Sequence, residues 1–273
     1  MNNWFDLLSF LLIVTVASIL WGRVNRIGYS RFISSVVYFL MKYTQANTEL
    51  IRGYLVWFIY MSAGLAAAAA LLLAYQVDLP RYLALDRKYF VLVPVAFIAE
   101  NALTGLMMQL LVLARPAMSI YLELTSILWI RYTLIMPSVM RVISPLGAAI
   151  AEEVFFRGTV FLVLIKHFPQ TGALLSTVIC TVLFVVQQVL QTDRRGQAWI
   201  MLIGSTSVSV VGCITILCTG SFLPTLLCHA AYACFYLQLG TSKNWGGVGS
   251  IAAMPMGNPN AQRSRLDSAY PDF

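Results

Sequence analysis

Long apolar runs separated by short polar connections dominate this chain of 273 residues and restrict its fold more than any other feature. Hydrophobic residues make up 59% and charged residues 11%, with a mean hydropathy of +0.78, whereas soluble domains are about 25% charged. A bilayer-spanning helix needs roughly 20 apolar residues. The sequence therefore predicts an all-α, polytopic transmembrane helical bundle with about eight spans, at about 4–20, 53–75, 90–114, 118–139, 143–165, 171–190, 198–218 and 221–240.

The N-terminal third has two features that bear on topology. The apolar run from Trp4 to Leu20 lacks the basic start and small-residue cleavage site of a secretory signal, so we expect a retained first span. The run from Phe32 to Met41 is too short to cross a bilayer and indicates an interfacial or re-entrant helix at about 32–42.

The net charge of +7 arises from 18 basic and 11 acidic residues. Because the basic residues fall mostly between apolar runs, membrane orientation and anionic lipid headgroups explain them better than nucleic acid does. Eight spans cannot place 22–52, Arg141, 194–195 and the C-terminus all on the cytoplasmic side. The five cysteines lie in apolar segments without a CxxC pair, which argues against a disulfide framework.

Three regions follow from these patterns. Residues 1–139 comprise N-terminal spans and the short helix. Residues 140–240 form the core whose spans carry the candidate catalytic residues, and residues 241–273 form a polar tail whose composition predicts disorder.

Glu152, Glu153 and Arg157 place three formal charges inside an expected span. Intramembrane charge usually marks a functional site. Glu153 and Arg157 are four residues apart, so they share a helical face and can pair. A purely structural ion pair between helices is the alternative. Glu152 has no cation at that spacing, and an unpaired carboxylate suits a general base.

Partners for Glu152 must come from other spans. His229 lies within the last expected span, whereas His167 lies in a connection and is expected to be solvated. Gln187 and Gln188 occupy the second half of the span that follows the glutamates, and antiparallel packing returns them to the depth of Glu152. We therefore expect a polar cavity formed by the last four spans, although a core role for His229 is equally compatible with the sequence.

Other intramembrane chemistries fit the sequence less well. No HExxH motif is present for zinc, and every aspartate lies in a connection or the tail. A serine dyad would need Ser205 or Ser207 to meet His229. Glu100 with Asn101, and Glu123 with Arg131, either line the cavity or pair with each other, and pairing is favoured.

Three separated elements within residues 140–240 resemble the CAAX prenyl protease and bacteriocin-processing intramembrane endopeptidases, also called the Abi or type II CAAX endopeptidase family. The Glu-Glu-x-x-x-Arg element is 152–157, the Phe-x-x-x-His element corresponds to 184–188, and the His-x-x-x-Asn element corresponds to 229–233. Two positions depart from the family pattern. Gln188 stands in place of histidine, and Ala233 stands in place of asparagine.

The resemblance implies that Glu152 activates water, that Glu153 and Arg157 support it, and that His229 donates to the oxyanion, with Gln188 orienting the water. It implies an endopeptidase that uses no cofactor or metal, acts on a membrane-associated or lipidated peptide or protein, and lies in a prokaryotic plasma membrane. Membrane lipids are expected partners and nucleic acid is not. The two departures keep open a catalytically inactive pseudoprotease that serves as a chaperone or scaffold. A small-solute transporter is the least favoured alternative because no inverted repeat is evident.

Overall fold

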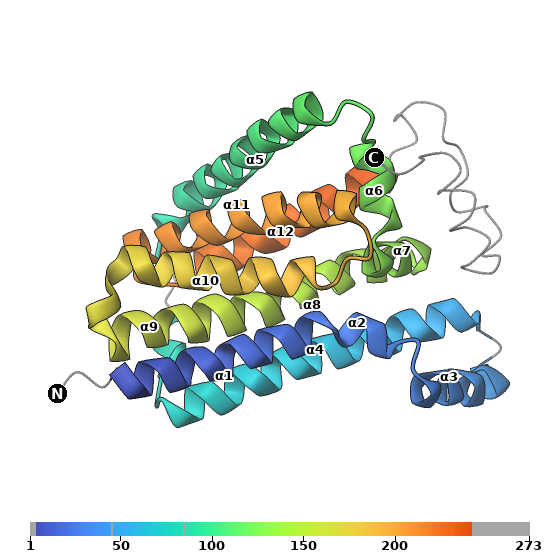
Figure 1. Cartoon of the computed structure of the whole chain (residues 1–273), viewed down its shortest axis with the longest axis horizontal. Helices are drawn as coiled ribbons and strands as arrows, with labels where there is room; N and C mark the ends of the chain where they lie inside the picture. Colours follow the sequence, from blue (N-terminus) through green and yellow to red (C-terminus); the bar gives the residue numbers. More distant parts are fainter. Residues whose placement is uncertain (1–3, 45, 84–85, 242–273) are drawn as a thin grey trace. The chain divides into compact units, whose positions relative to one another are not determined.

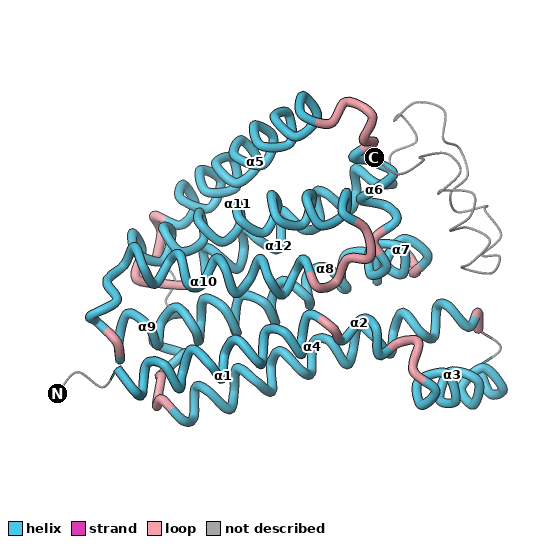
Figure 2. Tube along the Cα trace, in the orientation of Figure 1, coloured by secondary structure: helices cyan, strands magenta, loops and turns pink. Residues whose placement is uncertain are grey.

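The computed structural model describes residues 4–44, 46–83 and 86–241, and side chains as far as Leu237. Helices joined by short connections make up this part of the chain, and no strand occurs within it (Figure 2). The predicted all-α class is therefore confirmed. The predicted disordered tail lies outside the described residues apart from Thr241.

Five helices are long and apolar enough to cross a membrane. They are α1 (Trp4–Gly22), α4 (Thr48–Ala74), α5 (Tyr89–Ala114), α10 (Gly172–Val189) together with the preceding turn, and α11 (Arg195–Thr219). Helix α12 (Leu223–Thr241) is apolar over the shorter stretch Leu223–Leu237. The protein is thus a multi-pass membrane protein, and the five helices agree with five of the eight expected spans.

The segment that carries the paired glutamates forms one continuous helical run. It consists of α8 (Ser138–Phe155), a π-helical turn η2 (Phe156–Phe161) and α9 (Leu162–His167). The Thr159 hydroxyl donates to the Val154 carbonyl, 2.8 Å away and five residues earlier, which matches the wider turn. Such π turns occur frequently at functional sites. Here the turn follows Glu152 and Glu153 directly and contains Arg157.

The expected span at 118–139 is wrong as a single helix. The chain instead forms α6 (Ile120–Ser126) and α7 (Leu128–Ile135), which are separated by Ile127 in an extended conformation (φ −61°, ψ 130°). At 1.5 Å per residue, neither helix is longer than about 12 Å, so neither can cross a bilayer. The Gln197 amide nitrogen donates to Ser126 Oγ at 2.9 Å, which anchors α6 beside the start of α11.

The short helix expected at 32–42 is present as α3 (Arg31–Thr44), connected to α1 through α2 (Val24–Ile27). Ile33 and Val37 are buried against α4, whereas aromatic side chains on the other faces are exposed. A helix of 14 residues measures about 21 Å, which is less than the apolar thickness of a bilayer. Its location at the membrane interface stays a prediction.

The helices run between two ends of the bundle (Figure 1). At one end, Asn25 binds Gln191, Gly53 packs against Tyr132, and the Arg115 guanidinium lies over the Trp199 ring. At the other end, the backbone nitrogen of Phe222 donates to the Tyr82 carbonyl, close to the short helix η1 (Leu79–Leu83). A turn η3 (Pro169–Thr171) also lies at this second end and connects α9 to α10.

Basic residues are concentrated at the first end. Because α6 and α7 do not cross, the segments 23–52, 115–141 and 194–195 all lie at the same end, and the conflict that eight spans create disappears. This end, called the basic end below, carries Arg23, Arg26, Arg31, Lys42, Arg52, Arg115, Arg131, Arg141, Arg194 and Arg195; the opposite end carries Arg81, Arg87, Lys88 and Lys166. The positive-inside rule predicts that the basic end faces the cytoplasm.

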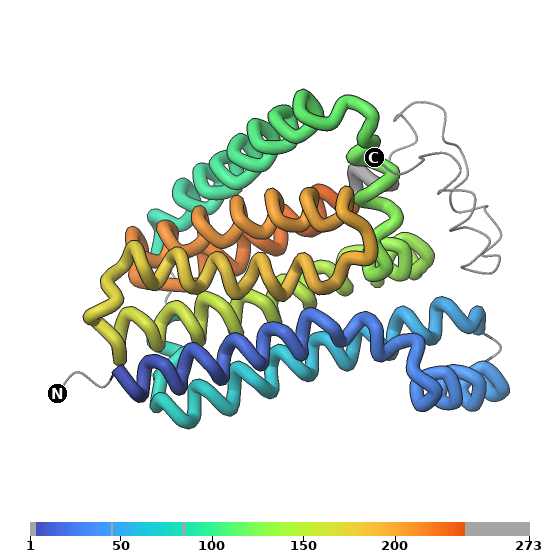
Figure 3. Tube along the Cα trace, in the orientation of Figure 1, coloured from blue at the N-terminus to red at the C-terminus, as the bar shows by residue number. Residues whose placement is uncertain are grey.

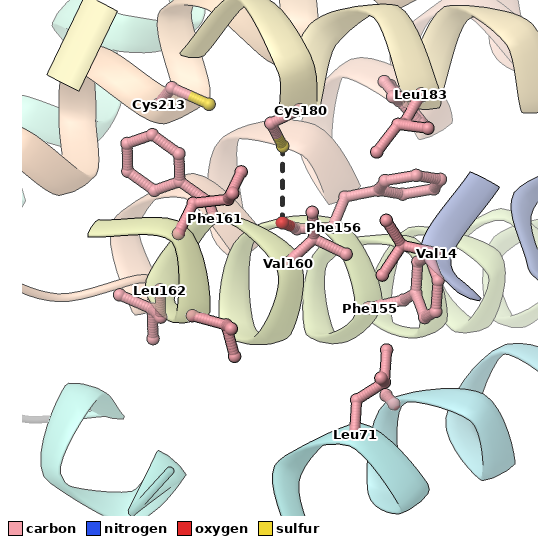
Figure 4. Close-up of a cluster of buried hydrophobic side chains, with 14 of the residues drawn as sticks. Val14, Leu71, Phe155, Phe156, Val160, Phe161, Leu162, Cys180, Leu183 and Cys213 are labelled. Atoms are coloured by element: carbon pink, nitrogen blue, oxygen red, sulfur yellow. Dashed lines mark hydrogen bonds between the residues drawn. The ribbon is translucent and has the colours of Figure 1, made fainter. Parts of the chain in front are cut away.

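The main hydrophobic core surrounds the π turn. Phe155, Phe156 and Phe161 are completely buried there, between Val14 of α1 and Leu71 of α4 on one side and Leu183 of α10 on another (Figure 4). Cys180 donates to the Phe156 carbonyl at 3.3 Å (Figure 4). Helices α1 and α10, distant in the sequence, therefore lie side by side against the segment that carries the glutamates (Figure 3).

Candidate active site

Helix α8 brings two adjacent carboxylates into the interior of the bundle. Glu152 is 6% exposed and Glu153 is completely buried. The helix starts after Pro137, which cannot continue a preceding helix. Gly147, about one and a half turns before the glutamates, allows α4 to come close, because a Cβ at that position would lie 2.5 Å from Met61 Sδ. The sequence of α8 thus lets Glu152 contact α4 through Tyr60.

Glu153 forms a buried ionic cluster with Arg157 and His229. Arg157 Nη1 lies 3.0 Å from Glu153 Oε1, and His229 Nδ1 lies 2.8 Å from the same oxygen. Arg157 and Glu153 have no exposed side-chain surface. The predicted i, i+4 pair is therefore present, and it also connects α8 to α12 through His229.

The Arg157 guanidinium is enclosed by α10 and α11. It lies over the Phe184 ring, 4.4 Å from the ring centroid, in a cation–π arrangement. A Cβ at Gly212 would lie 2.7 Å from Thr225 Cγ2 and 3.5 Å from Arg157 Nε, so the glycine lets α12 approach α11 next to the guanidinium. The cation is thus held by an aromatic face in addition to its carboxylate.

Glu152 receives donors from α4 and α10. Tyr60 and Gln188 both hydrogen-bond to Glu152 Oε1, and the Gln188 Nε2 distance is 2.8 Å. The other oxygen, Oε2, lies 3.5 Å from His229 Nε2. Glu152, Glu153, Arg157, Gln188 and His229, the five residues singled out from the sequence, therefore meet in one cluster.

The sequence did not identify Tyr60 as a member of this cluster. Its hydroxyl accepts from Gln187 Nε2 at 2.6 Å and from Gln191 Nε2 at 3.3 Å. Gln191 Oε1 in turn accepts from Asn25 Nδ2 at 2.8 Å. These residues form a buried hydrogen-bonded chain from Glu152 to the basic end. A tyrosine within an apolar span is the only available signal, and 13 tyrosines in the chain make that signal weak.

The remaining polar residues behave differently from the cluster. Glu100 on α5 is completely buried, and neither of its oxygens has a hydrogen-bond partner among the described residues. Asn101 donates to the Phe97 carbonyl, so the favoured pairing of Glu100 with Asn101 is wrong. Glu123 and Arg131 form no ion pair in the described part either. His167 ends α9 with its side chain exposed.

Ser205 and Ser207 do not form a dyad with His229. Each hydroxyl donates to the carbonyl of the residue four positions earlier on α11, at 2.5 Å for Ser205 and 3.0 Å for Ser207. Such bonds are typical of serines within transmembrane helices. His229 instead uses both ring nitrogens near the carboxylates of α8.

The cluster can carry out acid–base chemistry on a small molecule such as water. Glu152 is a carboxylate whose Oε1 is held by two donors, and His229 is held by Glu153 at its Nδ1. Because Glu153 pairs with Arg157, its carboxylate is an acceptor and His229 Nδ1 is the donor. The second imidazole nitrogen and Glu152 Oε2 therefore face each other as the two groups available to a reactant.

Comparison with known proteins identifies one region of the chain. A family model described as type II CAAX prenyl endopeptidase Rce1-like matches residues 134–235. This segment extends from the end of α7 to α12 and includes all three sequence elements. Comparison with curated proteins and with solved structures gave no match.

Proposed function

We propose that the protein is an intramembrane endopeptidase with Glu152 as its general base, because residues 134–235 match the type II CAAX prenyl endopeptidase Rce1-like family model, as the three motifs predict. The convergence of Glu152, Gln188 and His229 from α8, α10 and α12 supports this proposal most directly. Gln188 and His229 are distant from Glu152 in the sequence, yet both lie next to its carboxylate. A family of endopeptidases also favours catalysis over the pseudoprotease alternative.

Glu152 Oε2 is placed to take a proton from water. In the proposed reaction, the water oxygen bonds to the scissile carbonyl carbon while one water proton moves to Glu152 Oε2. The carbonyl oxygen then carries the negative charge. When the C–N bond breaks, the carbonyl re-forms and Glu152 returns the proton to the leaving nitrogen, so the products are a carboxylic acid and an amine.

His229 supplies the donor for the oxyanion. Its Nδ1 is fixed by Glu153, which leaves Nε2 to face the reaction space beside Glu152 Oε2. Because Nδ1 already donates to Glu153, Nε2 can donate only from an imidazolium, whose charge would balance the two carboxylates together with Arg157. Preorganised donors of this kind contribute most where water is excluded.

Gln188 holds the base and reaches water only through its amide oxygen. Its nitrogen donates to Glu152 Oε1, so the oxygen is the atom that would accept from the hydrolytic water. An amide cannot take up a proton near neutral pH. Gln188 is therefore an orienting residue, and proton transfer belongs to Glu152.

The substrate is proposed to be a peptide or protein that reaches the site from the membrane, because the catalytic cluster is buried in a bundle of apolar helices. Lipidated proteins fit this requirement, since the lipid brings the peptide to the bilayer. Membrane lipids are the remaining expected partners. Residence in a prokaryotic plasma membrane stays an expectation from the sequence.

The test compares newly formed protein termini in membranes from cells that carry wild type, Glu152→Gln, Glu49→Gln or no copy, with equal expression confirmed. Glu49 is a partly exposed carboxylate at the start of α4 and serves as a matched control. We expect fragments with wild type and Glu49→Gln only. If Glu152→Gln yields the same fragments as wild type, Glu152 is not the base. If all four strains show the same termini and Glu152→Gln restores the deletion phenotype, the protein binds without cutting.

A further inference from the structure

Tyr60 connects the catalytic carboxylate to helix α4, which lies outside the family-matched segment 134–235. Its hydroxyl contacts three side chains, namely Glu152 Oε1, Gln187 Nε2 at 2.6 Å and Gln191 Nε2 at 3.3 Å. Tyr60 is 5% exposed, and Gln187 and Gln191 are also buried. A second region of the chain thus contributes a polar group to the site.

The partners of the Tyr60 hydroxyl determine where its proton points. A hydroxyl has one proton and two lone pairs, and an amide nitrogen can only donate. Gln187 and Gln191 both approach with nitrogen, so they occupy the two lone pairs. The single proton is therefore directed at Glu152 Oε1.

This direction distinguishes the two oxygens of Glu152. Oε1 accepts from the Tyr60 hydroxyl and from Gln188 Nε2, so both of its lone pairs are used. Oε2 lies 3.5 Å from His229 Nε2, which is longer than an ordinary N–H···O hydrogen bond. Oε2 is therefore the oxygen that can accept a proton from water.

The packing around Tyr60 keeps its hydroxyl in place. Trp21 Nε1 donates to the Tyr60 carbonyl at 2.9 Å, and the two rings lie 5.0 Å apart. Gly64, one turn further along α4, lies so close to the Trp21 indole that a Cβ there would be 2.2 Å from it. Because these contacts involve the ring and the backbone, Tyr60→Phe retains them and removes only the hydroxyl.

We propose that Tyr60 is a positioning residue that, together with Gln188, occupies Glu152 Oε1 and thereby makes Oε2 the catalytic base. This inference rests on the proposed function, because it assigns a role within the same reaction. It adds a residue from α4 to a site that the sequence motifs place only on α8, α10 and α12.

The first test measures the hydrogen bond itself and needs no substrate. The infrared difference between wild type and Glu152→Gln isolates the Glu152 carboxyl band in purified protein in lipid nanodiscs. We expect Tyr60→Phe to shift this band and Tyr75→Phe to leave it unchanged. Tyr75 is a suitable control because it caps the same helix and packs against Phe10 and Phe168, away from the cluster. An unshifted band in folded Tyr60→Phe overturns the inference.

The second test measures turnover of a synthetic peptide that spans a cleavage site found by the terminus comparison. A hydrogen bond to a charged group corresponds to about a 10- to 100-fold effect on rate. We expect Tyr60→Phe to lower kcat by that factor with KM unchanged, since Tyr60 acts through Glu152. Tyr75→Phe should match wild type. A change in KM alone, or an unchanged kcat, contradicts the positioning role.

A double-mutant cycle with Gln188→Met tests whether Tyr60 and Gln188 act through the same oxygen. Two donors to one atom should give effects on kcat that are not additive, whereas independent roles give additive effects. If Tyr60→Phe fails to accumulate, the Glu152 band in Gln188→Met carries the test, and an unshifted band there overturns the assignment of Oε1.

The outcomes separate this inference from the proposed function. If Glu152→Gln cleaves the peptide as wild type does, both are wrong. If Glu152→Gln is inactive and Tyr60→Phe is fully active, only the positioning role of Tyr60 is wrong.

Discussion

Replacing Arg157 by methionine isolates the energetics of the buried ionic cluster. The substitution keeps an unbranched side chain against the Phe184 ring but removes the cation that faces Glu153. Glu153 and Arg157 are both completely buried, so water cannot take over the lost interaction. We expect Arg157→Met to destabilise the protein strongly.

The magnitude follows from the geometry. Two unit charges 3.0 Å apart interact with about 5 kcal/mol at an effective dielectric constant of about 20. Removing one partner of a buried pair costs about 3–5 kcal/mol, because the other charge stays buried. His229 Nδ1 also contacts Glu153 Oε1 and offsets part of this loss. We therefore expect a reduction of about 3 kcal/mol in the free energy of unfolding.

A second substitution should recover most of this loss. In Arg157→Met/Glu153→Gln the uncompensated carboxylate is gone, and replacing a buried ion pair by neutral groups is often close to neutral. The glutamine oxygen can still accept from His229 Nδ1. Reversible unfolding in mixed micelles with increasing fractions of SDS measures all three proteins, and Arg81→Met on exposed η1 is the control, expected within about 0.5 kcal/mol of wild type.

Two results would refute this reasoning. If Arg157→Met is as stable as wild type, the pair contributes nothing and Glu153 is compensated by another group. If Glu153→Gln does not restore stability, the loss comes from packing around Phe184 and not from uncompensated charge.

Three further outcomes test other parts of the structure. A Cβ at Gly22 would lie 2.6 Å from the Gln187 carbonyl oxygen, so we expect Gly22→Ala to lower the free energy of unfolding by about 1–3 kcal/mol in the same assay. A Cβ at Gly105 would have no atom within 4 Å, so Gly105→Ala should not destabilise, and equal effects of the two substitutions would contradict the close α1–α10 contact. The basic end should face the cytoplasm, so in intact cells a membrane-impermeant maleimide should label Asp86→Cys and leave Asp193→Cys unlabelled. Both variants also carry Cys218→Ser, which removes the exposed native cysteine, and the reverse labelling pattern would mean that the topology is inverted. Ala233 lies one turn after His229, so Ala233→Asn should add an oxyanion donor and raise kcat at least about tenfold. Ala231→Asn on the exposed face of the same helix should not raise kcat, and no gain with Ala233→Asn would mean that position 233 does not face the oxyanion.

The apolar runs predict the helical class because the requirement for about 20 apolar residues is local. The same reasoning fails at 118–139, where hydrophobic content alone suggests a span. Ile127 is extended there, and Ser126 is bound by Gln197 from α11, so the break depends on a contact between distant segments. Eight spans place the basic residues on both sides, and this conflict disappears because the segment 118–139 does not cross.

The candidate site was predictable where charge and helical spacing determine it. Glu153 and Arg157 pair because four residues separate them, and antiparallel order returns Gln188 and His229 to the depth of Glu152. Tyr60 obeys neither rule, since it lies on a helix nearly 100 residues earlier and carries no charge. Its role depends on the packing of α4 against α8, which Gly147 permits and hydropathy does not reveal.

Buried polar groups explain both the successes and the failures of the sequence reasoning. A polar side chain in an apolar interior needs a partner, so a set of polar residues at one depth predicts a cluster without specifying its pairs. The Asn101 amide nitrogen and the Ser205 and Ser207 hydroxyls each donate to a carbonyl of their own helix, and all three residues lie outside the cluster. The side chains of Glu152, Gln188 and His229 are longer and extend to neighbouring helices. Side-chain length and the availability of a local carbonyl therefore distinguish Glu152, Gln188 and His229, which meet across helices, from Asn101, Ser205 and Ser207, which bond within their own helices.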